Sequence, residues 1–291
     1  MTYIDQHAPD LIEKLAGFHN QRPQHCNTYL LIDGVFDSRW FAYLSSQPAL
    51  SWHALLASLP GNSKAVLKIS PLLVSYAPDD QEMESLLRAT SGKPMLSVLN
   101  TPDDMDLLSD RLARWCVVKA DGQSFNFRFT DTRRLPGIVA ALDAQQRGQL
   151  LGPTQGAHYV NRQGRWEALS LPQQPESPVA QRVELTDAQF AKMVADSEAD
   201  EILAALAQPL PSGYAALAPS QRYARARLAL TLAERHDQKD APGRMALCRL
   251  TLEFPEWESD AACVEQVLKT TVEDTDRWER IAEQLRERNP T

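Results

Sequence analysis

The sequence of 291 residues predicts an α/β (α+β) protein, with an N-terminal lobe of mixed β-sheet flanked by helices and an all-α C-terminal lobe. Short apolar runs alternate with helical patterns over the first 171 residues, an Asp-Gly hairpin turn lies among them, and only helical patterns follow residue 184. The length allows two domains, which we place at 1–171 and 184–291. Residues 172–183 contain three prolines and few large apolar side chains, so we expect a linker there.

The first strand signal is the segment YLLIDGVF at 29–36. A continuous apolar run of this length, ended by turn residues, is typical of a buried strand. Asp33 and Gly34 favour a turn at its end. Asp37 is suited to cap a helix that continues through Leu44.

Two apolar, partly β-branched runs follow at 65–69 and 72–76. Pro71 separates them, and a central strand does not tolerate proline in mid-ladder because proline has no amide hydrogen. Thr101 and Pro102, followed by two aspartates, have the cap, first-turn proline and early acids of a helix start. The patterns in between predict a helix at 79–88 and a strand at 95–99.

The clearest local signal is the segment 115–130. Two runs flank Asp121 and Gly122, a dipeptide that favours a type I′ hairpin turn because both central positions need positive φ. The second run alternates, with three phenylalanines on one face and polar side chains on the other. The downstream patterns predict two short helices within 135–151 and a small hairpin within 159–169.

Beyond the proposed linker the sequence requires no strand. Thr186 is suited to cap a helix that begins at Asp187. Prolines separate the later helical patterns, which we place at 220–235, 243–252, 260–269 and 274–288. We therefore expect a helical C-terminal lobe.

The net charge of −8 is concentrated in the C-terminal third of the chain. Residues 1–183 hold 17 basic and 18 acidic residues, whereas residues 184–291 hold 13 and 20. An acidic surface repels a phosphate backbone, so we do not expect nucleic acid as a partner. A basic protein segment fits this charge better.

The sequence indicates a cytoplasmic protein. Its first thirty residues contain Asp5, Asp10 and Glu13 and lack the basic start and apolar run of a secretory signal. No stretch approaches the roughly 20 apolar residues of a membrane span, so we expect no membrane insertion. The four cysteines form no CxxC pair, which suits reduced thiols.

The usual chemical motifs do not occur. No glycine-rich turn ends in Lys followed by Ser or Thr, as a phosphate loop requires. The six histidines show no HExxH or HxH spacing, and no serine lies in a GxSxG elbow. We therefore expect no metal, no cofactor and no catalytic residue.

The densest polar cluster follows the long hairpin and consists of Arg128, Asp131, Arg133 and Arg134. One interpretation is an anion site or charged contact surface, because arginine can bind a carboxylate with two parallel hydrogen bonds. The other is structural: Asp131 caps the following turn and pairs with Arg128 or Arg133. Asp33 has two interpretations as well, a catalytic carboxylate or a turn residue before glycine.

The order of several motifs resembles one family. The segments YLLIDGVFD at 29–37, SPLLVSY at 70–76 and FRFTDTRRL at 127–135, and the helix at 143–153, are similar to successive motifs of DUF4123 proteins. The resemblance extends over about half of the chain. Its signature positions correspond here to Asp33, Gly34, Arg128, Asp131 and Arg133.

The resemblance implies an adaptor and chaperone of the bacterial type VI secretion system. Such a protein binds a cognate effector, keeps it stable and helps to load it onto the spike protein, without a cofactor. Two other functions stay open. One is an immunity protein that inhibits a toxin, and the other is a small α/β enzyme that uses Asp33, Asp131 and Arg133.

Overall fold

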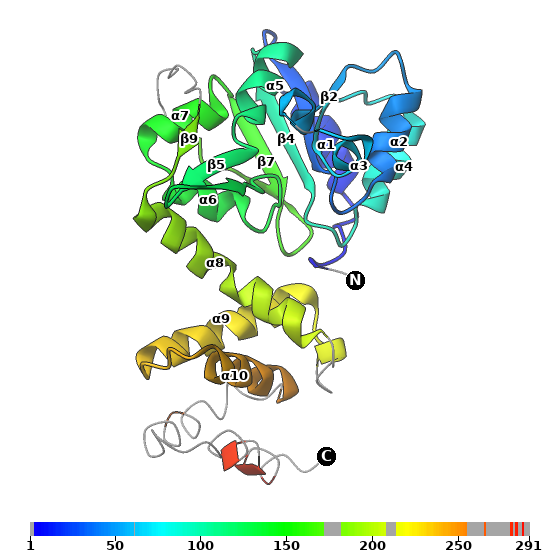
Figure 1. Cartoon of the computed structure of the whole chain (residues 1–291). Helices are drawn as coiled ribbons and strands as arrows, with labels where there is room; N and C mark the ends of the chain where they lie inside the picture. The colour runs from blue at the N-terminus through cyan, green and yellow to red at the C-terminus, as the bar shows by residue number, and fades with distance from the viewer. Residues whose placement is uncertain are drawn as a thin grey trace. The chain divides into compact units, whose positions relative to one another are not determined.

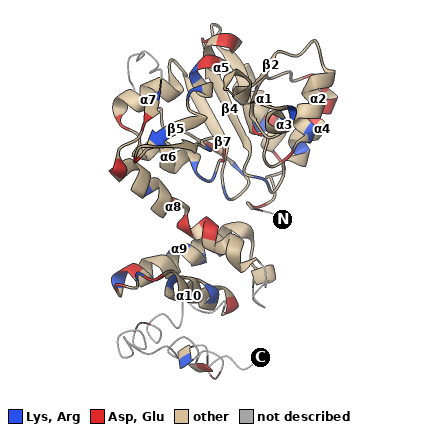
Figure 2. Ribbon diagram, viewed as in Figure 1, with Lys and Arg blue, Asp and Glu red and all other residues tan. Residues whose placement is uncertain are grey.

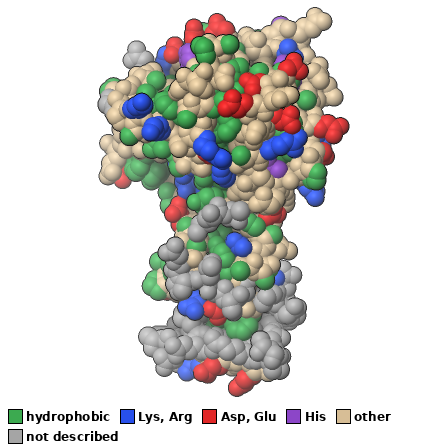
Figure 3. All heavy atoms as spheres, turned by 90° about the vertical axis from the view of Figure 1, so that its right-hand side faces the viewer, with side chains coloured by type: hydrophobic (Ala, Val, Ile, Leu, Met, Phe, Trp, Pro, Cys, Tyr) green, Lys and Arg blue, Asp and Glu red, His purple; other side chains and the backbone are tan. Residues whose placement is uncertain are grey.

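Figure 1 shows the fold of the chain as a computed structural model. The structure describes residues 3–60, 62–171, 182–207 and 214–254, together with Glu265, Arg280, Ile281, Glu283, Gln284 and Glu287. The chain forms two compact units, Met1–Asp196 and Ser197–Thr291. Charges of both signs occur in each unit (Figure 2), and apolar side chains lie among them on the face shown in Figure 3.

Unit 1 is built on a six-stranded antiparallel sheet in the order β2-β3-β1-β4-β7-β8. A smaller sheet has the order β6-β5-β9, in which β5 pairs antiparallel with β6 and parallel with β9. The strands are β1 (Asn27–Asp33), β2 (Trp52–Ala54), β3 (Pro71–Ser75), β4 (Leu96–Thr101), β5 (Val117–Ala120), β6 (Gln123–Asn126), β7 (Gly156–Val160), β8 (Trp166–Ala168) and β9 (Val183–Glu184).

Both faces of the large sheet are covered. Tyr29 and Leu31 of β1 belong to one apolar core, and Leu30 and Ile32, which point the opposite way, belong to a second. Helices α1 (Leu11–Asn20), α2 (Arg39–Ser46) and α4 (Gln81–Ala89) contribute to the second core, and α5 (Met105–Ala113), α6 (Leu135–Ala141) and α7 (Ala144–Leu151) contribute to the first. A strand buried on both sides explains the uninterrupted apolar run of β1.

Several local predictions are confirmed. Asp121 and Gly122 have φ values of 46° and 69° and join β5 to β6. The two short helices predicted within 135–151 form as α6 and α7. The second predicted hairpin forms between β7 and β8.

Three details differ from the sequence expectation. The run at 65–69 lies mainly in a short helix, α3 (Lys64–Lys68), because the Ser63 hydroxyl accepts a hydrogen bond from the Val66 amide and caps it. Pro71 is the first residue of β3, a position that needs no ladder amide. The residue that caps α5 is Asp104, whereas Thr101 still belongs to β4.

The fold class is as predicted, an α/β region followed by a helical one. The division into units falls at 196/197, inside helix α8 (Asp187–Leu206), and thus later than the predicted segment 172–183. Val183 and Leu185 are buried in the first core, and Phe190 and Met193 pack against it, which assigns the start of α8 to unit 1. Residues 172–181 of the predicted linker lie outside the described residues.

Unit 2 contains α9 (Pro219–Arg235) and α10 (Ala241–Glu253), close to the predicted 220–235 and 243–252. A short turn of helix, η2 (Tyr214–Ala216), precedes them; in unit 1 a similar turn, η1 (Leu55–Ser58), follows β2. The buried core of unit 2 includes Ala229, Leu230 and Leu247. The patterns at 260–269 and 274–288 lie largely outside the described residues. Among the helices described, none is long and apolar enough to cross a membrane.

Candidate functional site

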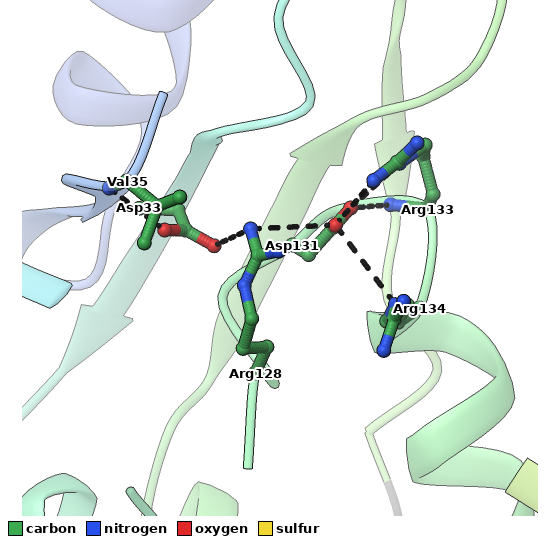
Figure 4. A network of polar contacts seen from close by, with 6 residues as sticks. All are labelled: Asp33, Val35, Arg128, Asp131, Arg133 and Arg134. Carbon is green, nitrogen blue, oxygen red and sulfur yellow. Dashed lines mark hydrogen bonds and ion pairs between the residues drawn. The ribbon is translucent and has the colours of Figure 1, made fainter. Parts of the chain in front are cut away.

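The six residues singled out in the sequence lie together at one end of the large sheet, and Figure 4 shows all of them except Gly34. Asp33 is the last residue of β1 and Gly34 follows it, and the other four residues follow β6. Both segments are hydrogen-bonded to the two residues that precede β4. The Asp33 amide donates to the Met95 carbonyl, and the Thr132 amide donates to the Pro94 carbonyl. This shared anchor explains how residues about a hundred positions apart form one site.

Arg128 connects two buried carboxylates. Its Nη2 donates to Asp33 Oδ2 at 2.9 Å and lies 3.6 Å from Asp131 Oδ2. Asp131 accepts hydrogen bonds from the Arg133 side chain at 2.7 and 3.0 Å and from its backbone amide at 3.1 Å. Arg134 Nε lies 4.0 Å from the same carboxylate. We call these five side chains the Asp–Arg network (Figure 4).

The network contains three cationic and two anionic side chains. Asp33 and Asp131 are both buried. Burial raises the pKa of Asp33, the ion pair and hydrogen bond with Arg128 counteract the rise, and the Asp131 charge adds to it. The pairing of Asp131 with Arg133 and Arg128 is the arrangement expected from the structural interpretation of the cluster.

Gly34 is required by a close approach of two chain segments. A Cβ atom at this position would lie 2.3 Å from the Ser70 carbonyl oxygen and 3.3 Å from the Ile69 carbonyl carbon. Asp33 Oδ1 meanwhile accepts a hydrogen bond from the Val35 amide, so Asp33 acts as a turn residue. The turn after β1 therefore packs against the backbone of Ile69 and Ser70, which follow α3.

Two aromatic side chains that sequence reasoning missed complete the site. The Arg128 guanidinium lies 5.0 Å from the centre of the Phe36 ring, and the Arg133 guanidinium lies 5.2 Å from that of Tyr3. The Tyr3 and Phe36 rings meet edge to face, with centroids 5.3 Å apart. Phe36 belongs to the run 29–36, but no local signal marks Tyr3.

A second ion-pair group adjoins the turn. Asp37 accepts hydrogen bonds from Arg39 and, at 2.6 Å, from Lys93 Nζ. Burial alone would raise the pKa of Asp37, but the hydrogen bonds from Arg39 and Lys93 outweigh it and hold the pKa well below its usual value. Asp37 therefore stays ionised and ties the turn to the segment before β4.

The arrangement of the Asp–Arg network favours holding and recognition over proton transfer. Both carboxylates already accept hydrogen bonds from arginines of the same chain. Arg128 and Arg134, in contrast, are each about one third exposed. Within the described ranges, no group of three or more His, Cys, Asp or Glu side chains is placed to hold a metal ion.

Comparison with known families gives a match over residues 28–149 to the family described as "Domain of unknown function (DUF4123)". The matched segment runs from β1 into α7 and contains all six predicted site residues. Comparisons with curated proteins and with solved structures gave no match. The family match supports the resemblance indicated by the order of motifs.

Proposed function

We propose that this protein is an adaptor and chaperone that binds a cognate type VI secretion effector, keeps it stable and helps to load it onto the spike protein. The observation that carries the proposal is the DUF4123 match over residues 28–149. The adaptor role comes from the resemblance to that family. In this proposal the protein acts in the cytoplasm, by binding alone and without a cofactor.

The site geometry supports a binding role for the signature residues. A general base must reach a substrate proton within roughly 3 Å. Asp131 is buried and is occupied by Arg133 and Arg128, and Asp33 is buried and occupied by Arg128. We therefore propose that the carboxylates orient the arginines, and that the arginines and their neighbours contact a partner.

The acidic C-terminal third supports a second contact. Residues 184–291 carry 20 acidic and 13 basic residues, so their field attracts a basic segment of the effector. Such attraction mainly raises the association rate, and salt screens it beyond about 8 to 10 Å. An adaptor that joins an effector to a spike needs two contact surfaces, and a difference in charge keeps two surfaces distinct.

Co-expression tests the proposal. The tagged full chain would be produced with the effector encoded beside its gene, and an effector from an unrelated system would serve as the control. We expect the neighbouring effector alone to co-purify and to stay soluble only when the chain is present. An effector that is soluble by itself and does not bind the chain would contradict the proposal.

The same complex distinguishes the two other functions. An immunity protein abolishes the toxic activity of its partner at one-to-one stoichiometry, whereas an adaptor can leave its effector active. If activity disappears on binding, the immunity function replaces ours. If effector is consumed or modified and Asp131→Asn stops this while binding continues, the enzyme function replaces it.

A further inference from the structure

Exposed apolar side chains gather beside the Asp–Arg network. Val35 and Ile69 are each 48% exposed, and Tyr3 is 37% exposed. The contact between Gly34 and the Ile69–Ser70 backbone brings the first two segments together. Tyr3 lies next to the segment of Val35 because its ring contacts the ring of Phe36. Exposed apolar residues are normal singly, whereas a contiguous apolar patch rimmed by polar residues is typical of an interaction site.

The cation at this surface has unused hydrogen-bonding capacity. Throughout the described part of the chain, every hydrogen bond and ion pair of Arg128 is made by Nη2. Its Nη1 donates to none of those residues and is not buried, whereas Nε is buried without an acceptor among them, so Nη1 is the atom that a partner can reach. The guanidinium is held in place by Asp33 on one side and the Phe36 ring on another, so it loses little freedom when it binds an anion.

We propose that Tyr3, Val35, Phe36, Ile69 and Arg128 form a docking surface for a protein segment that presents an apolar side chain next to a carboxylate. The carboxylate pairs with the guanidinium of Arg128, and the apolar side chain covers Val35 and Ile69. The proposal rests on the proposed function in one respect, that the chain works by binding proteins. It adds where one partner binds and what that partner must carry.

Charge complementarity supports this occupant. Arg128 is about one third exposed, so part of its positive charge reaches the surface beside the apolar side chains. A carboxylate can pair with Arg128 here, whereas a basic segment would be attracted by residues 184–291. The two surfaces therefore accept segments of opposite charge, and a segment that suits one surface should bind the other more weakly.

A peptide selection tests the surface without knowledge of the effector. The immobilised full chain would be offered random peptides of about twelve residues, displayed either internally or with a free C-terminus. We expect enriched peptides to carry Asp, Glu or the terminal carboxylate beside an apolar residue. The two display formats distinguish a side-chain carboxylate from a terminal one.

Variants at exposed positions then locate the binding. Ile69→Glu and Val35→Glu place a carboxylate in the surface without removing a buried group. We expect each to weaken binding of the enriched peptides by about tenfold or more, as the loss of one hot-spot contact does. Leu107→Glu is the matched control, because Leu107 is an exposed apolar residue on α5 in the same unit.

The outcomes separate this inference from the proposed function. Peptides without a carboxylate, no enriched peptides, or equal binding to all three variants would overturn the docking surface. If such peptides are selected but the neighbouring effector is not captured, the surface stands and the proposed function fails. If the effector is captured and no such peptide is selected, the surface is wrong and the function stands.

Discussion

The two ends of the β1–β4 pair carry two different kinds of Asp–Arg site. β1 and β4 run antiparallel, so Ile32 opposite Leu96 marks one end and Asn27 opposite Thr101 marks the other. Beyond Ile32 lies the Asp–Arg network. Beyond Thr101, Asp103 pairs with Arg111 at 2.8 Å, and both side chains are about one tenth exposed.

The comparison shows how similar chemistry gives a closed and an open site. Gly152 closes the Asp103 site, because its backbone lies so near the Arg111 guanidinium that a Cβ atom would be 2.4 Å from Cζ. The Asp–Arg network at the opposite end has five charged side chains, and one of them, Arg128, is about one third exposed. We infer that the closed pair stabilises the sheet end, and that the open network does so and also faces a partner.

Removing the shared carboxylate of the open network should have the largest effect. Asp131→Asn leaves Arg128, Arg133 and Arg134 together without their common anion. Breaking a buried pair by removing one partner costs about 3 to 5 kcal/mol. We expect this loss in urea unfolding followed by tryptophan fluorescence. Asp103→Asn should cost about 2 kcal/mol, since the hydrogen bonds from Arg111 Nε and Nη2 to the charged Asp103 carboxylate are weakened or lost. Equal losses at the two ends would refute the distinction between them.

Sequence reasoning found the parts of the open site that depend on neighbouring residues. The turn role of Asp33 and the pairing of Asp131 with Arg133 involve partners two residues away. Such contacts follow from local chemistry, so a single sequence reveals them. The hairpin turn at Asp121 and Gly122 was predicted for the same reason.

The parts that were missed depend on distant residues. The pair Arg128–Asp33 spans 95 positions, and the contact of Tyr3 with Arg133 spans 130, so no local pattern indicates them. Likewise Val66 and Ile69 have strand-like side chains, but the Ser63 cap decides for helix α3. Leu185 is buried in the first core although it lies two residues before the start of α8. The sequence indicates a helix start there but not the core against which Leu185 packs.

The glycines at the two ends give the second comparison. At Gly34 the obstacle to a side chain is the Ser70 backbone carbonyl, which cannot move alone. Overpacking of this kind costs about 1 to 3 kcal/mol, and we expect Gly34→Ala to lie at the upper end. Gly152 has φ of +53° and faces the Arg111 side chain, which can rotate.

A double-mutant cycle makes this difference measurable. Shortening Arg111 to Ala should reduce the cost of Gly152→Ala, because part of that cost is contact with the guanidinium. Shortening Arg128 to Ala should leave the cost of Gly34→Ala unchanged within about 0.5 kcal/mol. Unfolding free energies of the single and double variants provide both values. A coupling at Gly34 as large as that at Gly152 would argue against a rigid backbone contact.

The pH dependence of stability should separate Asp37 from Asp33, four residues apart. The lowered pKa of Asp37 means that its stabilising contribution is complete above its ordinary pKa of 3.8 and is lost as the pH falls below it. Asp37→Asn should therefore cost about 1 to 2 kcal/mol at neutral pH, from the lost hydrogen bonds to Arg39 and Lys93. This cost should shrink at pH values below 3.8.

Asp33 should show the opposite trend. Its pKa is raised, so its contribution is complete below the ordinary value of 3.8 and is lost as the pH rises through the folded-state pKa. The cost of Asp33→Asn should therefore be larger in acid than at neutral pH. Urea unfolding of both variants across this pH range tests the two signs. Parallel trends would show that the two carboxylates do not experience different environments.

The smallest effect on stability is expected at the exposed apolar residues. Ile69→Glu beside the open network and Leu107→Glu near the closed pair both alter side chains that are about half exposed or more. Surface substitutions of this kind change stability by about 0.5 kcal/mol or less. Neither position supports a buried contact on which its sheet end depends, so both variants should unfold at the same urea concentration as the unaltered chain. This equality matters because only Ile69→Glu should weaken peptide binding. If Ile69→Glu also lowers the unfolding midpoint and Leu107→Glu does not, Ile69 supports the fold, and its exposure is no sign of a docking surface.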